Sequence, residues 1–246
     1  MKKHLQIFSL VLLLTPAAIQ AQEIKKDLRP FSKVIVSPKI NVILHQGSRE
    51  SIRIDYFGIE PEKIQVEQDN DRLKIYLEEA RFVEKQDRYD DSGSKVGRYH
   101  QAIITAHITY THLDLLEVRG DQEITCLSPI EADQFTLRVY GENEITLDTL
   151  RIQRFKLVAY GENKIRLKGT ADHQRYALYG ENKVDSRALT GATISTNLYG
   201  EGRLMVKATD EVKINAIGEP RIEVEGTSFI NKGIILGKSE IRPPQD

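Results

Sequence analysis

Little cysteine, no tryptophan and no excess of charge of either sign characterise this sequence of 246 residues. The single cysteine, Cys126, excludes a disulfide framework and a zinc site built from thiolates, and we expect it to be a small buried apolar residue. Lys and Arg number 35 against 36 Asp and Glu, so no positive field indicates binding to nucleic acid. Hydrophobic residues make up 40% and charged residues 29%, which excludes a wholly disordered chain and predicts a globular domain.

The apolar run over residues 5–14 is too short for a membrane-spanning helix, which needs ~20 residues. Lys2 and Lys3 precede this run, and small residues with a proline follow it, which is typical of a secretory signal peptide over residues 1–21. Residues 22–246 would then form the exported protein. We expect it in the periplasm, on the outer-membrane surface or outside the cell, without a membrane span.

Most of the remaining chain is an internal repeat, in which glycines recur every 18 to 21 residues from Gly120 to Gly237. The clearest copies are YGENEITL, YGENKIRL, YGENKVDS and YGEGRLMV. In every copy the residues two before and four after the glycine are apolar, while the intervening positions carry Tyr, Glu, Lys and Arg. This alternation predicts β-strands with one buried face.

The length of the repeat selects the fold. About 20 residues hold two or three short strands but no helix, and the blade of a β-propeller needs roughly 40. The asparagine and leucine signature of a leucine-rich repeat is also missing. The sequence therefore predicts an all-β protein, a single-stranded right-handed parallel β-solenoid (β-helix) with coils of about 20 residues stacked ~4.8 Å apart.

Within this single domain the repeat is not uniform. Residues 31–80 alternate less regularly and are expected to form irregular N-terminal coils that cap the solenoid. Residues 81–100 are charged and lack sustained alternation, so we expect a mobile excursion from the wall. The regular coils are expected over residues 101–241.

The opening strand FSKVIVSPKINVILHQG, over residues 31–47, together with the tandem coils of the type Gly-x-x-x-apolar, resembles the putative auto-transporter adhesin head domain, or GIN domain. The resemblance extends to about residue 222. It implies an extracytoplasmic β-solenoid with no established enzyme activity, and it carries over no catalytic residues. Tyr-Gly-Glu-Asn stands here where that family usually has small residues around the glycine.

Alternation through the glycine predicts which side chains of each coil point inward and which point outward. Asn143, Asn163 and Asn182 should point inward and form a structural amide ladder. Two outward columns are the candidate ligand-binding residues: Tyr140, Tyr160, Tyr179 and Tyr199, and Glu142, Glu162, Glu181 and Glu201. A third outward column is mainly basic, with Lys164, Lys183, Arg203 and Arg221.

Three interpretations of these outward columns remain open. They form a solvated surface of paired charges, a binding face for a glycan or a surface protein, or, with weaker support, a carboxylate site for Ca²⁺. Arg119-Gly120-Asp121 spells an integrin-type tripeptide, but the repeat already accounts for it.

The sequence predicts neither an enzyme nor a cofactor. The histidines share no spacing of a metal site, and no nucleophile motif is present. We therefore expect a non-catalytic protein of the cell envelope or surface that acts in adhesion or ligand binding. The alternatives are a polysaccharide-processing enzyme on a β-helix scaffold and a purely structural envelope component.

Overall fold

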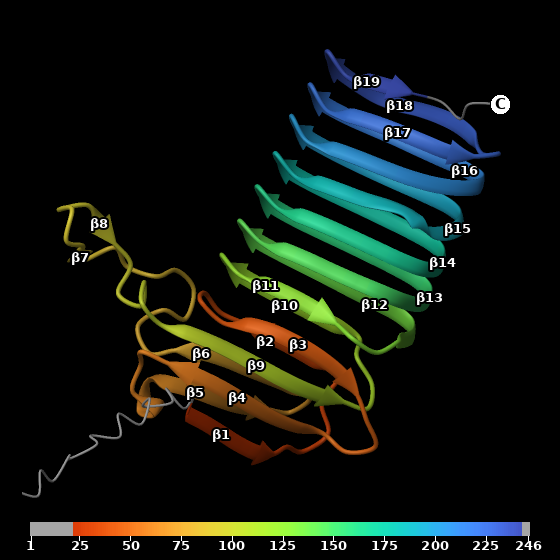
Figure 1. Cartoon of the computed structure of the whole chain (residues 1–246). Coiled ribbons are helices and arrows are strands. Elements are labelled where there is room, and N and C mark those ends of the chain that lie inside the picture. The colour runs from red at the N-terminus through yellow and green to blue at the C-terminus, as the bar shows by residue number, and fades with distance from the viewer. Residues whose placement is uncertain (1–21, 243–246) are drawn as a thin grey trace, which may run out of the picture.

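The computed structural model describes residues 22–242, so the expected signal peptide lies outside the described residues. The described chain is built almost entirely of strands, stacked along one axis (Figure 1). The N-terminal part contains β1 (Gln22–Asp27), β2 (Lys33–Val36), β3 (Asn41–Gln46), β4 (Ser51–Phe57), a short 3-10 helix (Pro61–Lys63), β5 (Ile64–Asp69), β6 (Arg72–Leu77), β7 (Arg88–Tyr89), β8 (Lys95–Val96) and β9 (Ile103–Tyr110). The coils contain β10 (Leu115–Gly120), β11 (Glu123–Cys126), β12 (Ile130–Gly141), β13 (Glu144–Gly161), β14 (Lys164–Gly180), β15 (Lys183–Gly200), β16 (Arg203–Gly218), β17 (Arg221–Gly226), β18 (Phe229–Gly237) and β19 (Glu240–Arg242).

Two walls of parallel strands meet at the repeated glycine. The first wall holds the strand that precedes each glycine, and its register pairs each corner glycine with the next, as in Gly141 with Gly161. The second wall holds the strand that follows, and it pairs Ile145 with Ile165 in the same way. Each of the long strands β13–β16 runs from one wall into the other. This arrangement confirms the predicted parallel β-solenoid with coils of about 20 residues.

Glycine is required at the corner because the backbone there adopts a conformation that other residues rarely reach. Gly161 has a φ of 104°, in the left-handed region. A Cβ atom on Gly161 would lie 2.2 Å from the carbonyl oxygen of Gly141 in the preceding coil. The corner therefore combines a positive φ with a close approach between coils, and both conditions exclude a side chain.

The space between the walls is filled by the apolar positions that the alternation predicts. From Ile124 to Ile222, the residues four positions after the corner glycine are at most 2% exposed, and Ile241 in the last coil is half-buried. Farther from the corner, Phe135, Phe155 and Tyr176 pack in successive coils, with ring centroids 6.1 Å apart at both steps. Burial of each such side chain contributes about 1.5–3 kcal/mol, so the repeat supplies its own core.

The predicted amide ladder lies inside the corner. Asn143, Asn163 and Asn182 are at most 2% exposed. The Nδ2 of Asn163 donates to the carbonyl of Tyr160 at 3.0 Å and to Oδ1 of Asn182 at 2.8 Å. Its Oδ1 in turn accepts from the backbone N–H and from Nδ2 of Asn143, both at 2.9 Å. These bonds satisfy backbone groups that the corner leaves without a ladder partner.

The stacking order at the N-terminal end differs from the order along the chain. β2 and β3 lie between β6 and β9 on one side and β10 and β11 on the other, so a coil formed by β6 and β9 precedes them in the stack. Residues 101–110 were expected to begin the regular coils, but 103–110 form β9, which pairs antiparallel with β4. The regular coils therefore begin at β10. Alternation reports a buried face but not the direction of pairing, so the sequence could not distinguish the two arrangements.

Antiparallel strands close this end of the stack. β1 pairs with β4 on one wall, and β5 pairs with β6 on the other. The β5–β6 turn is at Asn70, which has a positive φ of 52°, as the Asp-Asn-Asp sequence predicts.

At the opposite end, β18 and β19 are edge strands in the described part of the chain. Lys232 of β18 is in register with Ile214, whose side chain points into the core. A lysine at an inward position of an edge strand opposes pairing with another strand, because its ammonium group would have to be buried. Among residues 22–242, no helix is long and apolar enough to cross a membrane.

We predict that Asn163→Ala lowers the free energy of unfolding by about 2–4 kcal/mol, because it removes several buried hydrogen bonds and leaves their partners unsatisfied. Asn143→Ala should cost less, since the Oδ1 of Asn143 has no partner among the described residues. Urea denaturation of both variants measures the difference. Equal losses would show that the ladder does not act through these bonds.

Buried tyrosines predict a loss of stability at alkaline pH. Burial raises the pKa of Tyr176 above its usual value near 10. The folded protein therefore holds this proton at a pH where the unfolded chain releases it, and the free energy of unfolding falls as the pH rises above about 10.

Urea titrations at about pH 9 and about pH 11 should show a smaller decrease for Tyr176→Phe than for the unchanged protein. Tyr89→Phe is the control, because Tyr89 is 65% exposed. An unchanged decrease in Tyr176→Phe would contradict the assignment.

Candidate binding ridge at the corner

The tyrosines beside the corner glycines form one straight column on the outside of the solenoid. The register of β12–β15 aligns Tyr140 with Tyr160, Tyr160 with Tyr179, and Tyr179 with Tyr199. Ile217 continues the column in the next coil. We call these residues, together with the glutamates that follow the glycines, the corner ridge.

Stacking determines which part of each ring is accessible. The centroids of successive rings lie 5.5, 4.4 and 5.0 Å apart, with interplanar angles of 7°, 4° and 1°. Tyr160 and Tyr179 therefore have ring neighbours on both faces and present mainly their edges and hydroxyl groups to solvent. Burial, followed by the neighbouring Tyr160, raises the pKa of Tyr179. The Tyr179 hydroxyl therefore remains neutral at physiological pH.

The glutamates form a second exposed column at the corner itself. The backbone N–H groups of Glu142, Glu162, Glu181 and Glu219 donate to the glycine carbonyl of the preceding coil, as from Glu162 to Gly141 at 2.9 Å. None of them forms an ion pair with a basic side chain within residues 22–242. Neighbouring carboxylates ~4.8 Å apart repel by roughly 1 kcal/mol in water, and the ridge keeps this repulsion. The glutamates are Glu142, Glu162, Glu181, Glu201 and Glu219.

The basic column does not neutralise these glutamates by direct contact. Its paired members reach toward the second wall instead, with Arg203 at 2.6 Å from Glu223 and Arg221 at 3.4 Å from Glu240. The ridge therefore presents tyrosine edges beside a row of unpaired carboxylates.

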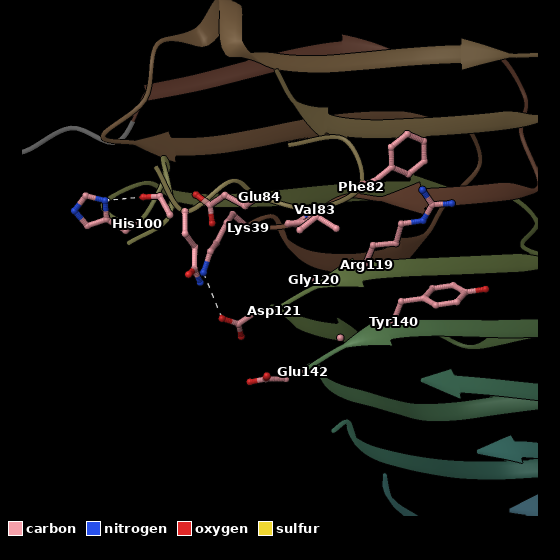
Figure 2. Close-up of a pocket in the computed structure, with 14 residues that line it drawn as sticks. Lys39, Phe82, Val83, Glu84, His100, Arg119, Gly120, Asp121, Tyr140 and Glu142 are labelled. Atoms are coloured by element: carbon pink, nitrogen blue, oxygen red, sulfur yellow. Dashed lines mark hydrogen bonds and ion pairs between the residues drawn. The ribbon is translucent and has the colours of Figure 1, made fainter. Parts of the chain in front are cut away.

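A cleft lies at the N-terminal end of the ridge. The connection from β6 to β9, residues 78–102, stands where other coils have their short corner, and we call it the corner insert. It covers the first corners of the stack and borders an open cleft with a volume of about 880 Å³, whose lining residues Figure 2 shows. Phe82 and Val83 of the insert line one side, and Arg119 and Tyr140 line another.

Contacts with the solenoid and within the insert hold the corner insert in place. Ser37, at the corner between β2 and β3, donates through Oγ to the carbonyl of Arg81 at 2.6 Å. The buried Tyr99 donates through its hydroxyl to the carbonyl of Glu78 at 2.6 Å, and its N–H donates to Glu84. Arg98 pairs with two acidic residues, Glu79 and Asp87. The predicted excursion is therefore anchored at its base, and its hairpin β7–β8 projects away from the stack (Figure 1).

Most charged groups in the cleft have partners. Lys39 lies 3.3 Å from Asp121, and the Nε of Arg119 donates to Glu117 at 2.8 Å. The guanidinium of Arg119 also lies over the ring of Phe82, 4.8 Å from its centroid. Both charged residues of the Arg-Gly-Asp sequence are thus engaged within the molecule.

The sequence predicted the two columns but not the cleft. Phe82, Lys39 and Arg119 were not among the candidate residues, because nothing in a single strand shows that the insert reaches the tyrosine column. The available signal was positional, since a charged segment of 20 residues interrupts the alternation where a corner should be.

A second hollow lies on the outside of the second wall, near β1 and β4. His45 and His107 stack there with centroids 6.1 Å apart, although the sequence gives them no common spacing. Burial, followed by His107 and Arg53, lowers the pKa of His45. Among residues 22–242, no group of three or more His, Cys, Asp or Glu side chains could hold a metal ion.

Comparison with known proteins places this geometry in a family. The model of the family described as "Putative auto-transporter adhesin, head GIN domain" matches residues 30–228. A comparison with curated proteins finds no match.

Solved structures share the fold at low identity. A putative adhesin from Bacteroides fragilis has a TM-score of 0.73 and 17% identity, over 92% of this chain and 98% of its own. A putative adhesin from Parabacteroides merdae has a TM-score of 0.65 and 14% identity, over 92% and 97%. A putative lipid binding protein from Parabacteroides distasonis has a TM-score of 0.64 and 13% identity, over 91% and 97%.

Because the family model covers most of the chain and the repeat geometry agrees with it, this protein belongs to the head GIN domain family of putative auto-transporter adhesins.

Proposed function

We propose that this protein is a non-catalytic, exported adhesion protein that binds a glycan or a surface protein along the corner ridge. The observation that carries the proposal is the column of four tyrosines stacked in register beside unpaired glutamates. Tyrosine edges with hydroxyl groups and carboxylates together offer apolar contact, hydrogen-bond donors and acceptors to a ligand.

The spacing of the ridge favours an extended ligand. Each coil presents the same pair of side chains after ~4.8 Å, so a polymer lying along the axis can make the same contact several times. Repeated weak contacts on one ligand combine into a much stronger attachment, because each later contact forms within the same complex. This is what adhesion to a repetitive surface requires.

The carboxylates of the cleft support binding rather than hydrolysis. Asp121 is held by Lys39, and Glu84 accepts the N–H of Tyr99. A glycoside hydrolase needs a carboxyl group that stays protonated and a second one free to act as nucleophile or base. Here two of the three carboxylates are already engaged with protein groups.

The names of the neighbouring structures agree with a surface role in different degrees. Two are called putative adhesins and one a putative lipid binding protein. In this chain the space between the walls is filled by fully buried core side chains such as Leu157 and Ile214. An acyl chain would have to displace them, so the outer ridge remains the better candidate.

We expect the triple variant Tyr160→Ala, Tyr179→Ala, Tyr199→Ala to lose at least about tenfold in affinity, or about 1.4 kcal/mol. The test is binding of the purified protein to an array of bacterial and host glycans and to isolated cell-envelope proteins. Replacement of the same tyrosines by phenylalanine keeps the ring and removes the hydroxyl group, so it distinguishes their contributions to the affinity.

Two controls keep the result interpretable. The variant Arg154→Ala, Asp172→Ala changes exposed residues farther from the ridge along the same strands and should bind normally. Removal of one stacked ring should cost about 0.5–1.5 kcal/mol for each ring pair lost, so the alanine variant must be shown to remain folded by its urea transition. Normal binding by the folded alanine variant would refute the ridge as the recognition face.

If a calcium chelator abolishes binding and the tyrosine substitutions do not, the binding site is the glutamate column with bound Ca²⁺. Absence of binding to every glycan and protein would favour a structural envelope component.

A further inference from the structure

The cleft at the N-terminal end of the corner ridge differs in shape from the ridge itself. Along the ridge the rings are covered by one another, whereas Phe82 is 64% exposed, with the Arg119 guanidinium over its ring. Tyr140 stacks on Tyr160 on one side, and Arg119 of the preceding coil is in register with it on the other. The cleft therefore offers a ligand the exposed ring of Phe82, whereas the rest of the ridge offers the edges of stacked tyrosine rings.

The corner insert also ends the ridge. The order of the corners in the stack runs from the insert through Lys39 and Asp121 to Glu142 and then along the remaining coils. The insert stands across this axis (Figure 2), so an extended ligand that follows the ridge toward the N-terminal end meets the wall formed by Phe82 and Val83. The volume of about 880 Å³ lies within the range of small-molecule sites, roughly 300–1,000 Å³.

Charge in the cleft selects the class of ligand. Its two cations, Lys39 and Arg119, are already paired with Asp121 and Glu117, and Glu142 adds an unpaired carboxylate. An anionic group would meet excess negative charge, and a cationic group could pair only with the exposed Glu142, a contact that contributes at most about 1 kcal/mol. A hydrocarbon chain would have to desolvate these charged groups. A neutral ring with one apolar face and several hydroxyl groups fits all of these conditions.

We propose that the cleft is an end subsite for a neutral glycan, whose terminal sugar stacks on Phe82 and whose next sugar donates hydroxyl hydrogen bonds to Asp121 and Glu142. These terminal sugars lie in the cleft while the following sugars extend along the ridge. This proposal rests on the proposed function, and it adds that the ridge has a defined direction and a terminus.

The absence of tryptophan from the sequence provides a specific probe. Phe82→Trp places a single indole in the cleft, and Phe229→Trp places one on β18 at the far end, where Phe229 is 71% exposed. Both variants are titrated with neutral tetrasaccharides of glucose, N-acetylglucosamine and mannose. Sialyllactose, inorganic phosphate and arginine serve as anionic and cationic comparisons.

We expect at least one neutral tetrasaccharide to change the emission of Phe82→Trp saturably and to leave that of Phe229→Trp unchanged. Glu142→Gln in the Phe82→Trp background should weaken this binding by about tenfold, because it removes a charged hydrogen-bond acceptor. A disaccharide and a hexasaccharide of the same sugar should each bind once per protein and lose affinity by a similar factor in Glu142→Gln, because only the terminal sugars of either one occupy the cleft.

The other outcomes separate the cleft from the ridge. Affinity that rises with every added sugar, falls in Tyr199→Ala and is unchanged in Glu142→Gln would retain the ridge and overturn the end subsite. A response only to sialyllactose, phosphate or arginine would overturn the neutral sugar as ligand. No emission change with any neutral sugar, while the tyrosine triple variant still abolishes attachment to the array, would also overturn the subsite and leave the proposed function standing.

Discussion

The close approach of successive coils at the corner glycine is the constraint on which the rest of the structure depends. The backbone of each coil passes so near the glycine carbonyl of the coil before it that only hydrogen fits between them. This contact fixes the axial position of every coil at one point. All other columns, inside and outside, take their register from it, because a β-strand has only one alternation of faces once a single residue is placed. The tyrosine stack is thus a consequence of the glycine stack.

The identical side chains that the repeat stacks attract one another inside the corner and repel one another outside it. Inside, the stacked amides attract one another, because an amide group is both a hydrogen-bond donor and an acceptor. These amides belong to Asn143, Asn163 and Asn182. The glutamates one residue away form a stack of identical carboxylates, which repel one another and have no ion-pair partner in the described chain. The ladder inside stabilises the corner, and the repulsion outside is tolerated because the carboxylates remain in water. The fold does not need this repulsion, so a binding function explains the glutamate column better than a contribution to stability does.

The periodicity of the sequence was sufficient to predict the regular coils. It was not sufficient to predict how the strands pair at the N-terminal end. The alternation around Gly141 and Gly161 determined the walls, the inward asparagines and the outward tyrosines, since each depends only on sequence distance from the glycine. It did not show that Ile103–Tyr110 pairs antiparallel with β4, because alternation is the same in both directions of pairing. Nor did it show that Phe82 meets Arg119, since that contact depends on how the corner insert folds back. The ring stacking was likewise outside its reach, because side-chain torsions decide whether tyrosines in register show faces or edges.

The interleaved position of β2 and β3 has a consequence for how the molecule forms. In the regular coils each strand pairs with a neighbour about one coil away along the chain, as Tyr140 does with Tyr160. β2 instead pairs with Arg72–Leu77 on one side and with Leu115–Gly120 on the other, so its partners are far away in sequence. Closure of long loops slows folding, whereas local contacts form quickly. The regular coils are thus the natural nucleus, and the N-terminal end is completed last. A chain that leaves a membrane channel N-terminus first would therefore emerge with its slowest part leading, and its first strands would wait for partners that are still inside.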